Sequence, residues 1–151
     1  MRVSVIGGST VSETTYETAR EVGQLVGARG HELVCGGLGG VMEAACRGAR
    51  EEGGHTIGIL PGENRERANP YVQTPLATGM GTARNVLVVL NGDAAIAVAG
   101  ATGTLSEIAI ARDYGRPVAG LETHQVHSLG IEHVDTPTAA VDYVESALAQ
   151  H

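Results

Sequence analysis

Short apolar runs that end at a glycine or at a Pro-Gly pair recur along the chain, and each predicts a buried strand. The runs are Val3–Ile6, Glu32–Cys35, Ile57–Leu60, Ala94–Ala99 and Val118–Ala119. They lack the polar alternation of a strand that has one face in water, which indicates parallel strands covered on both faces.

Helical patterns occupy the segments between these runs. Ser12 or Thr14 is placed to cap a helix that runs to about Ala28, and Gly30 takes the position where a left-handed residue ends a helix. The second pattern, Val41–Ala49, is built from small residues, which allow close approach to a sheet.

The later part of the chain predicts three more helices and one loop. Leu105–Tyr114 and Thr136–Gln150 carry apolar stripes at helical spacing. Val86–Leu90 is apolar and β-branched, but it lies too close to the next predicted strand, so we place it on a helix that starts near Gly81. The polar segment Gly62–Pro75 is typical of a loop that can cover a site.

The order of strand, glycine turn and helix repeats along the chain and predicts an α/β fold. Because right-handed crossovers join parallel strands, we expect a Rossmann-like, doubly wound parallel sheet flanked by helices. The length of 151 residues suits a single domain spanning residues 1–151.

The basic residues narrow the chemistry. All 10 are arginines, and without lysine the chain cannot form a pyridoxal Schiff base, a Walker-type phosphate loop or a kinase nucleotide site. The formal net charge of −7 repels phosphate backbones and anionic lipids, so we expect neither nucleic acid nor membrane as a partner.

The cysteines and the N-terminus indicate a cytoplasmic protein. Cys35 and Cys46 form no CxxC motif and follow no secretory leader, which is typical of reduced, buried thiols. The apolar run at the N-terminus is too short for a signal peptide or a membrane span.

Glycine turns at the carboxyl ends of the strands predict an anion site. Backbone N–H groups approach an anion closely at glycine, and each following helix adds the positive end of its dipole. The alternative is that these glycines only form tight turns. Neither Gly36–Gly40 nor Gly100–Thr104 completes a GxGxxG fingerprint, so a standard NAD site is not predicted.

Two charged residues are the strongest chemical candidates. Glu107 lies at the rim of the predicted crevice, where a carboxylate can orient hydroxyls, act as a base or stabilise an oxocarbenium ion. Its alternative role is structural, because Thr104-Leu105-Ser106-Glu107 has the pattern of a capping box. Arg84 follows a glycine-rich stretch and is placed near a helix start at the crevice.

Four segments together resemble the LOG-like Rossmann proteins, often misnamed lysine decarboxylases, and within them the short branch of molybdenum cofactor carrier proteins. The segments are Val5–Ser9 with Tyr16, Cys35–Ala44, Gly79–Asn85 and Ala99–Glu107, the last of which resembles the PGGxGTxxE signature. The resemblance covers about Val3 to Leu121.

The resemblance implies two functions. In phosphoribohydrolase members the signature glutamate and a preceding arginine cleave nucleoside 5′-monophosphates, and Glu107 and Arg84 stand at those positions. Ala99 replaces the motif's proline, Ala101 its second glycine, and Asn85 stands where hydrolases have lysine. A methyl group at Ala101 can limit the approach of the backbone to a phosphate or restrict a needed positive φ, so these departures favour the fold and an anion site over hydrolase activity.

The first hypothesis is a carrier-like protein that binds a phosphorylated nucleotide or pterin-type ligand, including the molybdenum cofactor. The second is a nucleoside 5′-monophosphate phosphoribohydrolase, in which Arg84 and Glu107 are catalytic and no cofactor is required. The expected ligand-binding residues are Gly7, Gly8, Ser9, Gly37, Gly39, Gly40, Met80, Arg84, Gly100, Thr102, Gly103, Thr104 and Glu107.

Two further expectations concern metals and assembly. The HxxH pair of His124 and His127 has no nearby cysteine or dense carboxylates, so no metal site is predicted. The resemblance implies a homo-oligomer, either a dimer or a tetramer.

Overall fold

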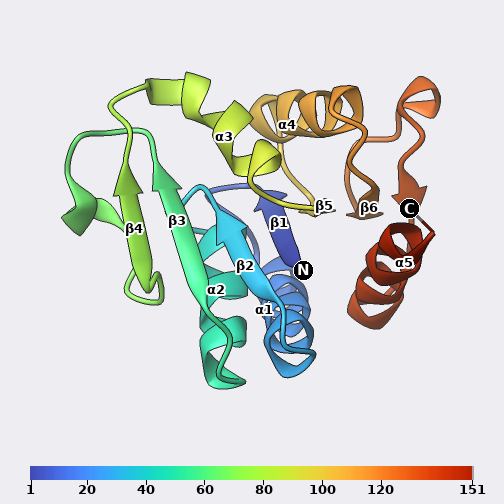
Figure 1. Ribbon diagram of the computed structural model, residues 1–151, viewed down its shortest axis with the longest axis horizontal. Coiled ribbons are helices and arrows are strands. Elements are labelled where there is room, and N and C mark those ends of the chain that lie inside the picture. The colour runs from blue at the N-terminus through green and yellow to red at the C-terminus, as the bar shows by residue number, and fades with distance from the viewer. Residues whose placement is uncertain (151) are drawn as a thin grey trace.

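The computed structural model describes residues 1–150 and contains a seven-stranded sheet in the order β4-β3-β2-β1-β5-β6-β7 (Figure 1). The strands are β1 (Arg2–Gly7), β2 (Glu32–Cys35), β3 (Thr56–Leu60), β4 (Thr74–Ala77), β5 (Ala94–Val98), β6 (Val118–Leu121) and β7 (Glu132–His133). All neighbouring strands pair in parallel. The chain moves outward from β1 to β4 and returns to the other side of β1 at β5, which confirms the doubly wound α/β prediction.

Helices cover both faces of the sheet (Figure 1). They are α1 (Glu13–Ala28), α2 (Val41–Glu51), α3 (Asn85–Leu90), α4 (Thr102–Asp113) and α5 (Pro137–Ala149). One apolar core joins the sheet to α1, α2 and α5, and a second joins it to α3 and α4. Within residues 1–150, no helix combines the length and the apolar character needed to span a membrane.

Side chains alternate between the two cores along each strand. On β2, Leu33 and Cys35 belong to the core under α1 and α2, while Val34 belongs to the core on the α3 side. All three are fully buried. The absence of polar alternation in the sequence therefore has the predicted cause, because both faces of the central strands are covered.

The start and end of α1 agree with the predicted signals. The Ser12 hydroxyl accepts a hydrogen bond from the Thr15 backbone N–H at 3.2 Å, so Ser12 rather than Thr14 is the N-cap. At the other end Gly30 adopts φ 77°, in the left-handed region where glycine is favoured. The predicted helix near Gly81 is also confirmed, since a 3₁₀ turn at Gly81–Arg84 leads directly into α3.

Two edge strands were not predicted. The predicted loop Gly62–Pro75 ends too late, because β4 already begins at Thr74. No pattern in the sequence indicates β7 at Glu132–His133. Both strands are short and lie at the ends of the sheet, where one side of the backbone has no strand partner.

The small residues of α2 pack in the core that it shares with the sheet, and its glycine brings it closest to α1. A Cβ atom added at Gly48 would lie 2.0 Å from the backbone oxygen of Arg20, and one added at Gly23 would lie 2.0 Å from that of Ala45. The predicted close approach is therefore present, and it is closest to the neighbouring helix.

Candidate functional site

A cavity of about 280 Å³ opens at the carboxyl ends of β1 and β2, beside the point where the strand order reverses. Doubly wound sheets bind ligands at this position. The lining residues are Val5, Ile6, Gly7, Gly8, Ser9, Gly36, Leu38, Met42, Thr82, Arg84, Asn85, Ala101, Gly103, Thr104 and Glu107. We call this space the switch-point cavity.

Arg84 supplies the cationic side chain of the switch-point cavity. Its Nε donates to the Ile59 carbonyl at 3.0 Å, its Nη2 donates to the Gly36 carbonyl at 3.5 Å, and its Nη1 donates to Asn85 Oδ1. Burial lowers the pKa of the guanidinium, and the charge of Glu107 opposes that change. Within residues 1–150 no carboxylate forms an ion pair with Arg84.

Glu107 is a buried carboxyl group that faces the same cavity. The residue is 9% exposed, and within residues 1–150 its side chain forms no hydrogen bond to protein. Burial raises the pKa of the carboxyl group to about 7, while the positive charge of Arg84 opposes part of the rise. A group with this pKa holds its proton in about half of the molecules near neutral pH, so it can donate or accept a hydrogen bond.

The capping-box alternative for Glu107 is wrong. Helix α4 begins at Thr102 with Ala101 as its N-cap, and the cap makes no side-chain hydrogen bond. Thr104 therefore lies inside the first turn instead of before it, and Glu107 lies in the second turn. Capping does not account for the burial of this carboxyl group.

In two neighbouring helices, one N-terminal amide is already hydrogen-bonded within the protein. In α1 the Ser12 hydroxyl accepts from Thr15 N–H, and in α2 the N–H of Val41 donates to the Gly8 carbonyl at 2.9 Å. The prediction that each glycine turn leads to a helix with free amides is therefore only partly correct.

Helices α2 and α4 both line the cavity near their N-termini without a side-chain cap, but only in α2 is one of the first three amides hydrogen-bonded within the described residues. The N–H of Leu105 donates to the Ala101 carbonyl at 3.0 Å, which is the first bond of the α-helical pattern. The amides of Thr102, Gly103 and Thr104 precede that bond and have no partner four residues earlier within the helix. Together with Arg84 they form an anion-binding arrangement.

The structure brings about half of the expected ligand-binding residues into this cavity. Those that line it are Gly7, Gly8, Ser9, Arg84, Gly103, Thr104 and Glu107. Those that do not are Gly37, Gly39, Gly40, Met80, Gly100 and Thr102. Gly40 shows the reason for some of these glycines: a Cβ there would lie 2.2 Å from the Gly8 oxygen, so the turns pack on each other. Met80 is 48% exposed at the surface.

Several lining residues were not predicted from the sequence. They are Val5, Ile6, Gly36, Leu38, Met42, Thr82, Asn85 and Ala101. Asn85 carried the clearest signal, because it follows Arg84 directly, and its buried amide holds the Arg84 side chain. Leu38 and Met42 had no signal of this kind, since apolar residues that line a cavity look like core residues in a sequence.

The expected restriction at Ala101 is wrong. Ala101 has φ −122°, which any residue adopts, so its methyl group causes no strain. The positive φ angles of this turn fall on the two preceding residues, Ala99 at 51° and Gly100 at 105°. The unusual residue is Ala99, because it adopts the left-handed conformation without being glycine.

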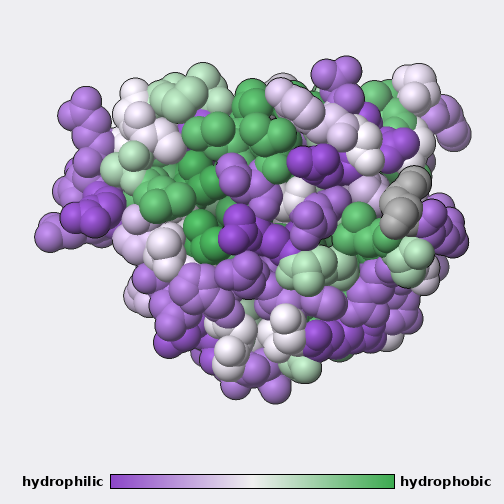
Figure 2. All heavy atoms as spheres, in the orientation of Figure 1, coloured by the Kyte–Doolittle hydropathy of each residue, from purple (hydrophilic) through white to green (hydrophobic). Residues whose placement is uncertain are grey.

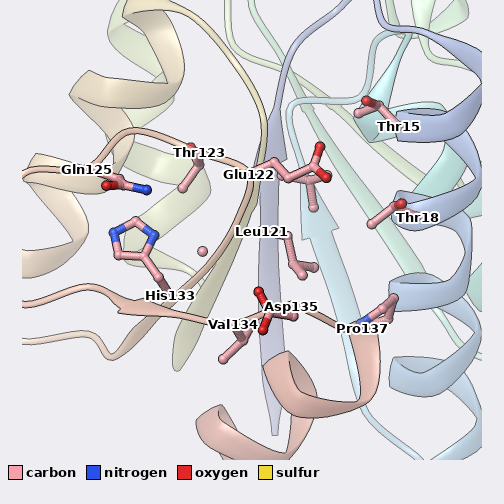
Figure 3. Close-up of a pocket in the computed structure, with 12 residues that line it drawn as sticks. Thr15, Thr18, Leu121, Glu122, Thr123, Gln125, His133, Val134, Asp135 and Pro137 are labelled. Atoms are coloured by element: carbon pink, nitrogen blue, oxygen red, sulfur yellow. The ribbon is translucent and has the colours of Figure 1, made fainter.

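A second cavity of about 260 Å³ lies at the ends of β5 and β6, on the side of α1 and α5 (Figure 3). The carboxylates of Glu122 and Asp135 and the imidazole of His133 belong to its lining, whereas no arginine of the described chain does. Phosphate binding is therefore better supported at the switch-point cavity.

The two histidines of the HxxH pair have different surroundings. The Nε2 atom of His124 lies 2.8 Å from the Ala101 carbonyl oxygen, and His127 begins a short 3₁₀ turn. In the described part of the chain, no group of three or more His, Cys, Asp or Glu side chains is arranged to hold a metal ion.

The cysteines lie next to the site but not in it. Cys35 and Cys46 are fully buried free thiols whose Sγ atoms are 3.5 Å apart. Cys35 Sγ also accepts a hydrogen bond from the Gly37 backbone N–H at 3.3 Å, so this thiol stabilises the glycine turn after β2. The ligand-facing alternative for Cys35 is not what the structure shows.

The sheet order and the cavity at its reversal point define a Rossmann-like ligand-binding protein. The chain belongs to the SLOG cluster4 family, whose model matches residues 1–150.

Similar proteins agree with this assignment. A protein of Archaeoglobus fulgidus is 44% identical over 147 residues, which cover 97% of this chain and 96% of that protein. The molybdenum cofactor binding protein of Rippkaea orientalis has a solved structure with a TM-score of 0.91 and 32% identity, covering 97% of this chain and 96% of the other. The molybdenum cofactor carrier protein of Chlamydomonas reinhardtii matches with a TM-score of 0.88 and 30% identity over 98% of both chains.

Proposed function

We propose that this protein binds a phosphorylated, ring-containing small molecule in the switch-point cavity and acts as a carrier of the molybdenum cofactor type. The observation that carries the proposal is the uncapped N-terminus of α4 beside Arg84, which has no ion-pair partner within residues 1–150. The phosphate would bind the amides of Gly103 and Thr104 and the Arg84 guanidinium.

The rest of the ligand would lie over the glycine turn after β1. Gly7, Gly8 and Ser9 line the cavity. Glu107 would pair with hydroxyl or N–H groups of the ligand, because a carboxyl group with a pKa of about 7 serves either as donor or as acceptor.

The molybdenum cofactor, a phosphorylated pterin, would be cargo rather than a resident catalytic group. The similar proteins of Rippkaea orientalis and Chlamydomonas reinhardtii bind or carry it, and both match nearly the whole chain. The cavity fits the phosphate of such a ligand through Arg84 and α4. Loading is measured as protein-bound molybdenum, by plasma mass spectrometry after gel filtration of protein mixed with released cofactor.

Phosphate recognition is tested by calorimetry with AMP as probe. We expect Arg84→Gln to weaken AMP binding about tenfold or more, because a charge-assisted contact contributes roughly 1.5–3 kcal/mol. Arg65→Gln is the matched control, since it makes the same change in net charge at an exposed residue outside the cavity. Equal affinities of the two variants would overturn the phosphate site.

The second candidate function is hydrolysis of nucleoside 5′-monophosphates. The observation in its favour is the carboxyl group of Glu107, whose pKa of about 7 suits a general acid or base at neutral pH. Arg84 would position the substrate phosphate. The protein is incubated with AMP, GMP and cytokinin monophosphates, and released base is measured by chromatography. If AMP binds but no base is released, the hydrolase function is rejected and the carrier function stands.

We also propose a cytoplasmic homo-oligomer, either a dimer or a tetramer. Exposed apolar side chains support association, and Figure 2 shows apolar residues gathered on the face that carries α3. Leu76, Met80 and Leu90 are the exposed large aliphatic side chains of the described residues. The unbonded thiols of Cys35 and Cys46 favour a reducing compartment. Light scattering of the purified protein and of Leu90→Glu tests the assembly.

A further inference from the structure

The turn between β5 and α4 is held from the side opposite the switch-point cavity. Ala99 and Gly100 adopt φ angles of 51° and 105°. An alanine keeps a left-handed conformation only where its surroundings fix it. The backbone at Ala99 is fixed on both sides: its N–H donates to the Leu121 carbonyl at 3.0 Å, and its carbonyl accepts from Thr123 Oγ1 at 2.7 Å.

A second side chain of the same loop holds the end of the turn. His124 Nε2 lies 2.8 Å from the Ala101 carbonyl oxygen. Because a carbonyl oxygen only accepts, Nε2 must carry the proton and the imidazole must donate. This donor exists both in one neutral tautomer and in the protonated imidazole, so the contact does not depend on the charge of His124. The same oxygen also accepts from Leu105 N–H at 3.0 Å.

These two hydrogen bonds orient the amides of the turn. In a trans peptide the C=O and the following N–H point in opposite directions. Since the Ala99 and Ala101 carbonyls bond to Thr123 and His124, the N–H groups of Gly100 and Thr102 face away from that loop. Thr123 lies on the rim of the second cavity in Figure 3, whereas Ala101 lines the switch-point cavity.

We propose that Thr123 and His124 are positioning residues, which fix the Ala99–Ala101 turn so that the N-terminal amides of α4 are presented to an anion in the switch-point cavity. Neither residue lines that cavity, so each would act through the backbone of the turn. The inference rests on the proposed phosphate site, but the arrangement of the turn can be measured without any ligand.

The test removes each donor while keeping its shape. Thr123→Val and His124→Phe lack the donor, whereas Thr123→Ser and His124→Gln retain one. In ligand-free protein, we expect amide hydrogen exchange at Ala99 and Leu105, whose N–H groups are hydrogen-bonded to the Leu121 and Ala101 carbonyls, to quicken at least tenfold in the first pair and to stay near wild type in the second. We expect the Kd for AMP to rise about tenfold in the first pair, with recovery in the second.

The control is Gln125→Ala, in the same loop, whose side chain makes no hydrogen bond to the turn within residues 1–150. It should leave exchange and AMP affinity unchanged. The inference is overturned if Thr123→Val and His124→Phe match wild type in exchange, or if AMP affinity falls equally in the Ser and Gln variants. Wild-type protein that fails to bind AMP, with exchange altered as expected, would reject the phosphate site and retain the support of the turn.

Discussion

Glu107 is a carboxyl group that the surrounding protein keeps from ionising. The residue is only 9% exposed, and this burial raises the free energy of the charged form more than that of the neutral form. The positive charge of Arg84 offsets only part of this difference. The folded protein therefore retains a proton on Glu107 up to about pH 7. An unpartnered buried acid weakens the fold, which is the pattern expected of a residue kept for binding or chemistry.

This carboxyl group should make stability fall as pH rises. The pKa is about 7 in the folded protein and 4.5 for the ordinary group, so between these values the folded state binds more protons than the unfolded chain. The loss reaches about 3 kcal/mol above pH 7. We expect Glu107→Gln to be more stable than wild type at pH 8 and similar at pH 4.5, as measured by urea unfolding. Parallel pH profiles for the two proteins would contradict the assignment.

Ala99 stands where the LOG-like signature has proline, and its backbone conformation explains why proline is absent here. Proline holds φ near −65°, whereas Ala99 has φ 51° and donates its N–H to Leu121. The turn in this chain is therefore one that proline cannot form.

Two substitutions at Ala99 separate the effect of its left-handed backbone strain from that of its N–H hydrogen bond to Leu121. Ala99→Gly relieves a left-handed strain of roughly 1–2 kcal/mol and loses part of it to chain entropy, so we expect equal or slightly higher stability. Ala99→Pro should destabilise by about 3 kcal/mol or more, through the lost N–H and the forced φ. Thermal melting measures both variants. A proline variant as stable as wild type would show that the turn has another conformation.

Arg84 and Glu107 could be predicted because both follow strand and turn signals that the sequence displays. Leu38 and Met42 could not, since whether an apolar side chain lines a cavity or fills a core depends on how its element is rotated. The restriction expected at Ala101 is wrong for a similar reason: the sequence shows a methyl group in the turn but not which residue of the turn adopts the positive φ.

At the scale of elements, the first three amides of α4 have no hydrogen-bond partner within the described residues, whereas amides at the start of α1, α2 and α5 are bonded. Ser12 and Thr136 cap α1 and α5, and a carbonyl occupies the first amide of α2. The sequence suggested a cap for α4 as well, because Thr104 and Glu107 have capping-box spacing. Strand β5 ends at Val98 and the turn closes at Ala101, so the helix starts before that pattern applies.

Helices α1 and α2 pack closely against each other at Gly23 and Gly48. We expect Gly48→Ala to destabilise by about 3 kcal/mol, because the new Cβ would lie 2.0 Å from a backbone oxygen that cannot move freely. Gly62→Ala is the control, since no atom lies within 4 Å of its added Cβ. Chemical denaturation compares them, and equal stabilities would mean that the two helices pack less closely than described.

The elements that sequence patterns missed lie at the sheet edges. Strands β4 and β7 are short, and neither has a continuous apolar run, because an edge strand has less of its surface covered. Pro75 within β4 argues against a central strand but is tolerated at an edge. The central strands were predictable because burial on both faces leaves a continuous apolar run.

At the scale of the whole molecule, the net charge of −7 opposes the approach of an anionic ligand. Binding must therefore come from local groups, which are the α4 amides and Arg84. Several other arginines make different contacts, such as the ion pairs of Arg20 with Glu51 and of Arg29 with Asp142. The absence of lysine excludes a Schiff-base decarboxylase and leaves anion binding to arginine and backbone.

The most direct test of this account is an NMR titration of the assigned backbone amides with AMP. The largest saturable shifts are expected at Gly103 and Thr104, which line the switch-point cavity, with smaller shifts at Gly8 and little change at Thr15, where Ser12 caps α1. Shifts centred on Glu122 and Asp135 of the second cavity, or the absence of saturable shifts at the start of α4, would contradict it.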